Sequence, residues 1–409
     1  MKTFVFSLSV LSALALWAEP TVSNVRVEQL DDATVKVTYT LDADAVVTLD
    51  ACTNETVSIG LANVTRVWGE ANRLVKGAGD HVLYWAPEKS WGVQPIVAGD
   101  VRVVVKAWAT DAPPDYMVVD LVVGKRVSYY ESVEQLPDGG ITSRVYKTDR
   151  IVMRKIPAKD VKWRIGSPSG EVGKVTDSWD AQEVPHHVTL RSDYYLGVYE
   201  FTEKQCNKWG RGTDYKEADA DKPVTGVSVR EMRGNESTGP YNWPTNGHDV
   251  DPKSILGLLR DKTGVDFDLP TEAQWEFACR AGVSSALYNG QNLTSKDGVN
   301  NQLDDIAWYD KNSDNSRHAV GQLKPNGFGL YDMLGNEGEF CLDWVVNNLG
   351  SGEVEDPVGP DSGSYKPLRG GAYDKAAYFS RAAFRQNWVS ESNQYVDCGH
   401  RLWAPAVAK

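Results

Sequence analysis

The sequence predicts two domains of different construction: an all-β sandwich at the N-terminal side and a larger, loop-rich domain behind it. The chain has 409 residues, which is more than one ordinary domain. Residues 21–122 are rich in β-branched residues with turn residues between them, whereas residues 151–409 are rich in Gly, Asn, Asp and aromatic residues. The first pattern favours short strands, and the second favours ordered loops held by side chain to backbone hydrogen bonds.

The chain begins with a predicted export signal. Lys2 supplies a positive charge, and an apolar run of about 15 residues follows before Glu19-Pro20. This run is shorter than the roughly 20 residues that span a bilayer. We therefore predict a Sec-type signal peptide over residues 1–18, cleaved after Ala18, and a periplasmic or extracellular location. No cysteine stands at the cleavage site for a lipid anchor, and no later segment is apolar enough to be transmembrane.

Residues 19–122 form the predicted sandwich. Alternating or clustered β-branched residues indicate strands that each bury one face, and turn residues such as Gly77 and Gly79 separate them. Several short strands at this spacing favour an immunoglobulin-like or fibronectin-like module. The predicted strands cover residues 22–27, 34–41, 45–49, 81–85 and 100–108.

The second domain is predicted over residues 151–409. Residues 123–150 are interpreted as a linker or hairpin extension, because Leu136-Pro-Asp-Gly-Gly140 is a turn signal between predicted strands that contain Tyr and Val. Two short helices are predicted inside the second domain, one capped by Thr202 and the other by Thr271.

Charge and cysteine content restrict the partners and the chemistry. Lys plus Arg total 43 against 56 Asp plus Glu, a formal charge of −13, so the chain has no cationic excess for nucleic acid. Five cysteines allow at most two disulfides. Their pairing stays open, with Cys341 and Cys398 as one candidate pair. No CxxC motif supports a zinc or redox site.

Three residue pairs or loops that suggest a reactive site have structural interpretations. His186 and His187 are adjacent in a predicted strand, so their side chains point to opposite faces. Glu272 and Glu276 lie one helical turn apart, but capping and loop contacts are favoured over catalysis. The loop at Asp310 lacks the glycine and the terminal glutamate of an EF-hand, so no metal is predicted there.

Three sequence blocks carry a family resemblance. They are residues 163–202 with Tyr199-Glu-Phe-Thr202, then Leu269-Pro-Thr-Glu-Ala-Gln-Trp-Glu276, then residues 306–402 with Gly335-Asn-Glu-Gly-Glu-Phe340, Arg369-Gly-Gly371 and Gly399-His-Arg-Leu402. In this order the blocks resemble the formylglycine-generating (sulfatase-modifying factor) family over most of residues 151–409.

The resemblance has consequences for fold and cofactors. It implies an α+β, loop-rich fold related to C-type lectin-like domains. It also implies a structural calcium ion held by backbone oxygens of Leu334, Gly335 and Glu337 and by the carboxylate of Glu339, since oxygen ligands suit calcium. The family's enzymes oxidise a sulfatase cysteine with two cysteines of their own, which hold Cu(I) through sulfur.

The loop that carries those cysteines in the family contains none here. Lys375 and Ser380 stand about where the cysteines are expected, Ala372 replaces the serine after Gly-Gly, and Gly338 and Phe340 replace two tryptophans. We therefore do not expect copper binding or thiol-dependent oxidation, and we assign no catalytic residue. The histidines contain no His-x3-His pair for the iron chemistry of related enzymes.

Two classes of function remain open. We favour a non-catalytic binding or scaffold role, in which aromatic residues of the C-terminal loops contact a glycan, a peptide or a protein. The alternative is an enzyme of altered chemistry on the same scaffold, with Ser380 and His400 or Lys375 and an adjacent acid as reacting groups, although no known motif surrounds either pair. The predicted ligand-site residues are Ala372, Tyr373, Lys375, Tyr378, Ser380, Arg381, Arg385 and Trp388.

Overall fold

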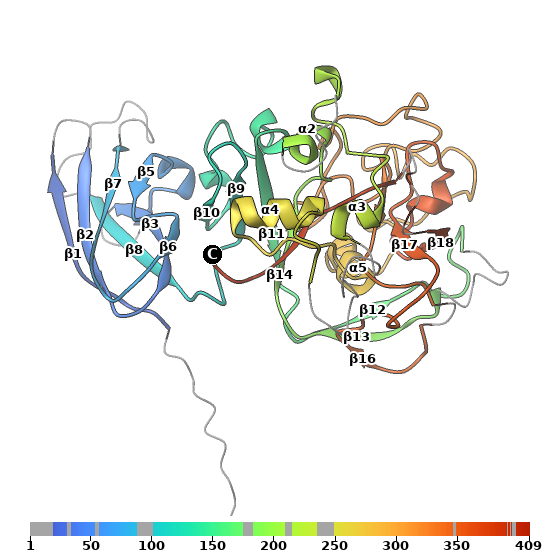
Figure 1. Cartoon of the computed structure of the whole chain (residues 1–409), viewed down its shortest axis with the longest axis horizontal. Coiled ribbons are helices and arrows are strands. Elements are labelled where there is room, and N and C mark those ends of the chain that lie inside the picture. The colour runs from blue at the N-terminus through green and yellow to red at the C-terminus, as the bar shows by residue number, and fades with distance from the viewer. Residues whose placement is uncertain are drawn as a thin grey trace, which may run out of the picture.

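The structure is a computed structural model that shows a β-rich N-terminal module beside a larger domain of helices and strands, with the C-terminus returning between them (Figure 1). The predicted signal peptide and the side chain of Trp388 lie outside the described residues. Within the described part of the chain, no helix is long and apolar enough to cross a membrane. The described residues are 19–30, 34–53, 57–87, 101–174, 183–208, 215–234, 249–346, 349–390, 392, 394 and 398–409.

The N-terminal module consists of two antiparallel sheets, as its alternating sequence predicts. One sheet has the order β1-β2-β7-β5, and in the other β3 pairs with β4, β6 and β8. Val37 and Leu83 of the first sheet and Val47 and Val105 of the second belong to one buried hydrophobic cluster. The strands are β1 (Val22–Gln29), β2 (Val35–Leu41), β3 (Ala45–Thr53), β4 (Val57–Ser58), β5 (Val67–Gly69), β6 (Arg73–Val75), β7 (Gly79–Trp85) and β8 (Val101–Trp108).

The second domain is built on a five-stranded antiparallel sheet of order β10-β9-β11-β14-β20. Its strands are β9 (Tyr116–Asp120), β10 (Arg126–Tyr130), β11 (Arg150–Ile156), β14 (Tyr194–Gly197) and β20 (Trp403–Pro405). The C-terminal strand β20 therefore pairs with β14 from the middle of the chain. Strand β20 is thus the edge strand of the sheet on the side opposite β10.

Strand β9 lies before the predicted boundary at residue 122 but belongs to the central sheet of the second domain, and residues 123–150 contain the hairpin strand β10, which agrees with the hairpin extension of the two predicted alternatives. Strand β9 pairs with β11, and β10 extends the same sheet as a hairpin with β9. Alternation shows that a segment is a strand but not which sheet it joins, so β9 was assigned to the wrong domain. The turn at residues 136–140 lies between two 3-10 helices, η2 (Val133–Gln135) and η3 (Arg144–Lys147), and not between strands.

Within the described residues, two smaller sheets and four α-helices complete the second domain. The sheets have the orders β12-β13-β16 and β18-β17-β15-β19. Their strands are β12 (Val161–Ile165), β13 (His186–Leu190), β15 (Gly338–Phe340), β16 (Val354–Glu355), β17 (Lys366–Arg369), β18 (Gln386–Val389) and β19 (Cys398–Gly399). The described helices of this domain are α2 (Glu203–Cys206), α3 (Val229–Arg233), α4 (Ile255–Thr263) and α5 (Glu272–Arg280), with the 3-10 helices η6 (Glu217–Asp219) and η7 (Ala377–Ser380). The 3-10 helix η1 (Leu61–Asn63) lies in the N-terminal module.

The two predicted helix caps are confirmed. The side chains of Thr202 and Thr271 accept hydrogen bonds from the backbone N–H groups of Gln205 and Gln274, respectively. In turn, the side-chain oxygen of each glutamine accepts a hydrogen bond from the backbone N–H of its threonine. This reciprocal pattern satisfies two N–H groups that the first helical turn leaves exposed. Helices α3 and α4 were not predicted.

The two domains are joined by packing and by hydrogen bonds. Val46 of the N-terminal module belongs to the same buried cluster as Met117 of the central sheet. The backbone N–H of Tyr129 donates to Asn72 O at 2.8 Å, and the N–H of Ala408 donates to Thr110 O at 2.7 Å. The C-terminal segment therefore lies against the junction between the two domains, as Figure 1 shows.

Candidate functional site

The loop of residues 370–380 follows strand β17 and closes on itself. Gly370 and Gly371 have φ angles of 94° and 78°, a region that glycine adopts without strain. A Cβ at Gly371 would lie 2.9 Å from the carbonyl carbon of Phe379. The two ends of the loop therefore pack directly against each other, and Ala372 is buried in the turn.

A second loop, residues 306–318, packs beside it. The backbone N–H of Asp310 donates to Lys375 O at 3.0 Å, and Ser313 Oγ donates to Tyr373 O at 2.7 Å. Trp308 and His318 are half-buried, and their rings stack with centroids 3.8 Å apart. Sequence reasoning placed Trp308 in a family block but gave it no role, because no local pattern pairs loops that are distant in the chain.

An aromatic surface lies on this loop. The ring of Phe379 is 4.4 Å from that of Tyr378 and 4.7 Å from that of Phe384, measured between centroids. Phe384 is buried, whereas Tyr378 and Phe379 are half-buried. The exposed Lys296 places its ammonium group 4.8 Å from the Tyr378 ring centroid, a cation–π contact. We call Tyr373, Lys375, Tyr378, Phe379 and Lys296 the aromatic loop face.

Besides Ala372, three predicted ligand-site residues are buried, and two of them hold the fold together through ion pairs. Arg381 is fully buried and donates to Glu171 at 2.8 Å and to Glu183 at 2.8 and 2.9 Å. Arg385 is paired with Glu272. Ser380 is fully buried too, and within the described structure its Oγ has no hydrogen-bond partner. None of these three side chains is exposed, so they cannot contact a ligand at the surface. The predicted ligand-site residues that stay candidates are Tyr373, Lys375 and Tyr378.

The carboxylates of helix α5 are neutralised by arginines. Glu276 accepts from Arg280 at 2.8 Å and also pairs with Arg369, and all three side chains are buried. Burial raises the pKa of Glu276, but the two guanidinium groups outweigh it and leave the pKa below its usual value. This arrangement supports the structural interpretation of Glu272 and Glu276, because each carboxylate is held by buried arginines, Arg385 at Glu272 and Arg280 with Arg369 at Glu276.

Glu339 does not fit the role of a calcium ligand. Both of its oxygens accept hydrogen bonds from Arg401, at 2.6 to 3.0 Å, and Trp275 Nε1 donates to Oε2 at 2.6 Å. The Arg401 guanidinium supplies the positive charge that a calcium ion would bring to this carboxylate, and it would repel a cation bound nearby. Among the described residues, no group of three or more His, Cys, Asp or Glu side chains could hold a metal.

The remaining predicted calcium ligands are placed by backbone contacts. The N–H of Gly335 donates to Gly370 O at 2.8 Å, and the N–H of Glu337 donates to Glu200 Oε1 at 3.0 Å. The side chain of Leu334 belongs to the hydrophobic core. Calcium at the backbone oxygens of Leu334, Gly335 and Glu337 stays a prediction.

The thiols of the second domain lie in the hydrophobic core. All five cysteines of the chain are free. Burial raises the pKa of Cys279, and burial together with the Glu272 carboxylate raises that of Cys341. Since Cys341 and Cys398 are both free, the suggested disulfide between them is not formed.

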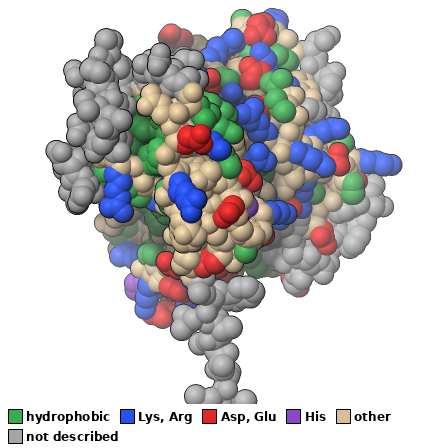
Figure 2. Space-filling model, turned by 90° about the vertical axis from the view of Figure 1, so that its left-hand side faces the viewer, with side chains coloured by type: hydrophobic (Ala, Val, Ile, Leu, Met, Phe, Trp, Pro, Cys, Tyr) green, Lys and Arg blue, Asp and Glu red, His purple; other side chains and the backbone are tan. Residues whose placement is uncertain are grey.

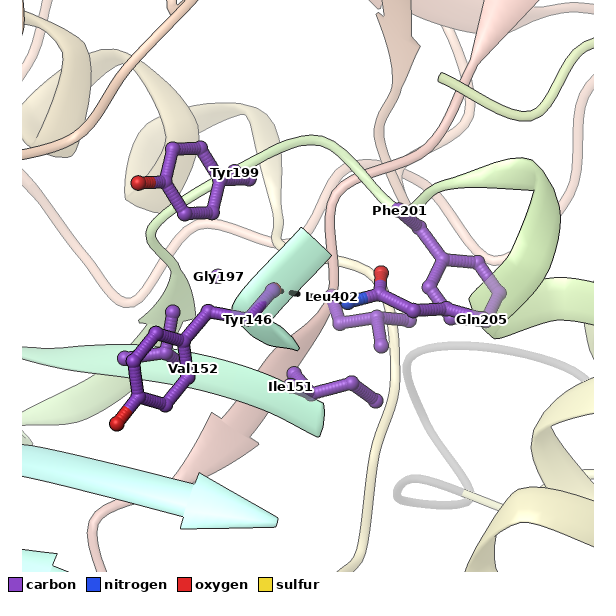
Figure 3. Close-up of a pocket in the computed structure, with 8 residues that line it drawn as sticks. All are labelled: Tyr146, Ile151, Val152, Gly197, Tyr199, Phe201, Gln205 and Leu402. Carbon is purple, nitrogen blue, oxygen red and sulfur yellow. Dashed lines mark hydrogen bonds between the residues drawn. The ribbon is translucent and has the colours of Figure 1, made fainter. Parts of the chain in front are cut away.

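The small cavity in Figure 3 is lined by no residue of the 370–380 loop. Its volume is about 10 Å³, which is close to the space of a single water molecule. Gln205 lies at its edge and donates to Tyr146 O at 3.1 Å and to Arg150 O at 2.7 Å. The cavity is a packing gap between η3, β11 and α2, and it is too small for an organic ligand.

Residues 153–404 match the family described as sulfatase-modifying factor enzyme 1-like domain. This match covers more than half of the chain and agrees with the loop-rich α+β fold. The chain therefore belongs to the sulfatase-modifying factor family, and the predicted family is confirmed.

Known relatives share parts of this domain. The formylglycine-generating enzyme of Bos taurus is 31% identical over 156 residues, which cover 37% of this chain and 41% of that protein. The serine/threonine-protein kinase pkn1 of Chlamydia pneumoniae is 35% identical over 227 residues, which cover 53% of this chain and 34% of that protein. The chain thus spans less than half the length of each of these two relatives.

Among solved structures, Treponema denticola variable protein 1 is similar in fold. The superposition has a TM-score of 0.46 at 25% sequence identity and covers 63% of this chain and 95% of that chain.

Proposed function

We propose that this chain is a binding member of the sulfatase-modifying factor family that does not carry out thiol-dependent oxidation. The observation that carries the proposal is the content of the 370–380 loop, where Lys375 lies near the surface, Ser380 is buried and no thiol is present. The buried thiols nearest in sequence are Cys341, which directly follows β15, and Cys398 of β19. Cu(I) is held by thiolates, and a buried thiol of raised pKa such as Cys341 stays protonated.

The aromatic loop face is the proposed ligand surface. It combines the half-buried rings of Tyr373, Tyr378 and Phe379 with the ammonium groups of Lys296 and Lys375. Aromatic rings provide large contact area at a small cost in conformational entropy, and ammonium groups donate to carboxylate or hydroxyl oxygens. A glycan, a peptide or a protein surface satisfies both features.

The alternative, an enzyme of altered chemistry, has less support. His400 is buried, its Nε2 lies 2.9 Å from Val227 O, and its ring stacks on Phe340 at 5.3 Å between centroids. It is therefore engaged elsewhere and does not act as a base for Ser380. Lys375 lies 3.0 Å from the carboxylate of Asp374, its sequence neighbour, at the surface. Neither pair forms the nucleophile and base arrangement that catalysis requires.

Two further points extend the proposal to the rest of the chain. We propose export through residues 1–18, which N-terminal sequencing of the protein from the periplasm or medium tests by finding Glu19 as the first residue. We also propose that the N-terminal module is of the immunoglobulin or fibronectin type, which its two antiparallel sheets and shared hydrophobic cluster support.

An oxidation assay separates the two functions. The purified chain, loaded with Cu(I), is incubated in air with a sulfatase peptide that contains the target cysteine, and the aldehyde product is measured by mass spectrometry. A formylglycine-generating enzyme serves as the positive control. We expect no conversion by this chain, and conversion above the copper-only background would overturn the proposal.

A glycan and peptide array then tests the ligand face. We expect the wild-type chain to bind a subset of probes and Tyr378→Ala to lose roughly tenfold in affinity, since truncating an aromatic anchor costs 1.4 kcal/mol or more. Tyr365→Ala is the matched control, because Tyr365 is an exposed tyrosine outside the face. Uniform lack of binding, or an equal loss in both variants, would contradict the assignment of this face.

A further inference from the structure

A second candidate site lies at the junction of the two domains, away from the aromatic loop face. A cleft of about 470 Å³ is bounded by residues 67–74 of the N-terminal module and by residues 123–130 of the β9–β10 hairpin. Contacts between the two domains hold its walls in place. Glu131 accepts a hydrogen bond from Thr48 Oγ1 at 2.6 Å and another from Lys106 Nζ at 2.6 Å. The cleft exists only because the two domains dock in this way.

The side chains that line the cleft carry positive charge and no acid. Arg73, Lys125 and Arg126 are all exposed there, and no Asp or Glu is among the lining residues. Within the described structure, no ion pair involves Lys125 or Arg126. Lys409 also lines the cleft, but its ammonium group lies 2.8 Å from the Asp266 carboxylate.

One acidic group offsets part of this charge. Glu70 lies near Arg73, and the charge of Arg73 is one of the influences that lower the pKa of the Glu70 carboxyl group. Burial raises that pKa, and hydrogen bonds from Val82 and His81 lower it. Lys125 and Arg126 therefore carry most of the uncompensated charge. A cleft whose charged lining residues are all cations is notable on a chain whose formal charge is −13.

An exposed aromatic ring completes the cleft. Trp68 lines it with 46% of its surface exposed. Its indole is backed by Tyr84, with ring centroids 5.7 Å apart and planes 16° from parallel. The indole therefore offers a flat apolar surface beside the cations of the cleft. Figure 2 faces this N-terminal end of the molecule and shows Lys and Arg side chains gathered over the right-hand half of the view.

We propose that this cleft binds an acidic saccharide, with Trp68 under a sugar ring and Lys125 and Arg126 on its carboxylate or sulfate groups. A flat indole packs against the apolar face of a pyranose ring. Guanidinium and ammonium groups bind planar or tetrahedral anions through charge-assisted hydrogen bonds. An acidic peptide would use the cations but has no need of the flat ring, so the saccharide is the better match.

Isothermal titration calorimetry of the full chain at about 0.15 M salt tests the proposal. The probes are a polygalacturonate oligomer, a dextran sulfate oligomer, a neutral dextran of matched length, and poly-glutamate. We expect binding of one or both acidic saccharides and none of neutral dextran or poly-glutamate. The first two probes distinguish carboxylate from sulfate as the recognised group.

Variants assign the binding to the cleft. Trp68→Ala and Arg126→Gln should each weaken binding of the acidic saccharide roughly tenfold, whereas Lys76→Gln, an exposed cation next to β6 that does not line the cleft, should leave it unchanged. Equal losses in Lys76→Gln, full binding by Trp68→Ala, binding of poly-glutamate at the same affinity, or no binding of either acidic saccharide would overturn the proposal. Circular dichroism confirms that each variant is folded.

Discussion

Arg401 is a fully buried cation whose partners come from three parts of the chain. Its guanidinium donates to the Glu339 carboxylate and to the backbone oxygens of Gly197 and Tyr331, at 2.6 to 3.0 Å. Arg369, Arg381 and Arg385 are buried against glutamates in the same way. Such pairs fix loop geometry, because a buried charge without its partner is costly.

Removing the partner of Arg401 should therefore destabilise the protein strongly. Glu339→Gln preserves the size of the side chain but leaves a buried guanidinium uncompensated, and we expect the free energy of unfolding to fall by about 3–5 kcal/mol. Urea denaturation measures this change. The control is Glu353→Gln, which removes an exposed ion pair with Lys162 and should have no measurable effect. Equal, small changes in the two variants would show that the buried pair is not a structural tie.

His400 makes stability depend on pH. Burial lowers its pKa from 6.5 to about 4, and the Val227 carbonyl and Glu231 only partly offset this. The unfolded chain thus takes up a proton at higher pH than the folded chain does. The neutral, buried His400 therefore contributes fully to the free energy of unfolding above pH 6.5. This contribution, about 3 kcal/mol in total, is lost as the pH falls toward 4.

The measurement compares wild type with His400→Gln in urea denaturation between pH 7 and pH 4. The wild-type stability should fall more steeply than that of the variant across this range. Comparing the two slopes removes the contribution of the buried acids, such as Asp332, whose pKa burial raises to about 6. Parallel slopes would mean that His400 is protonated without cost in the folded state.

At the scale of elements, helix α5 depends on its N-terminal cap. Thr271 Oγ1 accepts from the Gln274 N–H at 3.2 Å, and Gln274 Oε1 accepts from the Thr271 N–H at 2.9 Å. The helix carries Trp275, which donates to Glu339 and so connects α5 to strand β15.

Loss of this cap should cost about 1 kcal/mol of stability in Thr271→Ala, whereas Thr271→Ser should retain most of it, since serine keeps the accepting hydroxyl. The urea midpoint of each variant checks the order wild type, serine, alanine. A serine variant as unstable as the alanine variant would indicate that the threonine methyl group, and not the hydroxyl, is the stabilising feature.

At the scale of the whole molecule, the two domains should unfold together. Val46 shares a buried cluster with the central sheet, and Glu131 joins Thr48 and Lys106 of the module to the β10 end. We expect one cooperative urea transition for the wild-type chain. Glu131→Ala should separate an earlier transition of the N-terminal module, whereas Glu134→Ala, at an exposed neighbouring position, should not. Two transitions already present in the wild type would contradict the coupling.

Local patterns determined much of this protein from sequence alone. The alternation in residues 22–108 identified five strands of the N-terminal module, and Thr202 and Thr271 identified two helix starts, because these signals depend on neighbours within a few residues. The three sequence blocks identified the family, and the missing thiols near Lys375 argued against its oxidase chemistry.

Only the tertiary structure decided which sheet β9 joins, which predicted ligand residues are buried, and that Glu339 is paired with Arg401. It also brought the 306–318 loop to Tyr373 and formed the cleft between Trp68 and Arg126. These facts depend on contacts between residues that are far apart in the chain. Such contacts are set by packing and charge pairing, and composition and spacing do not record them.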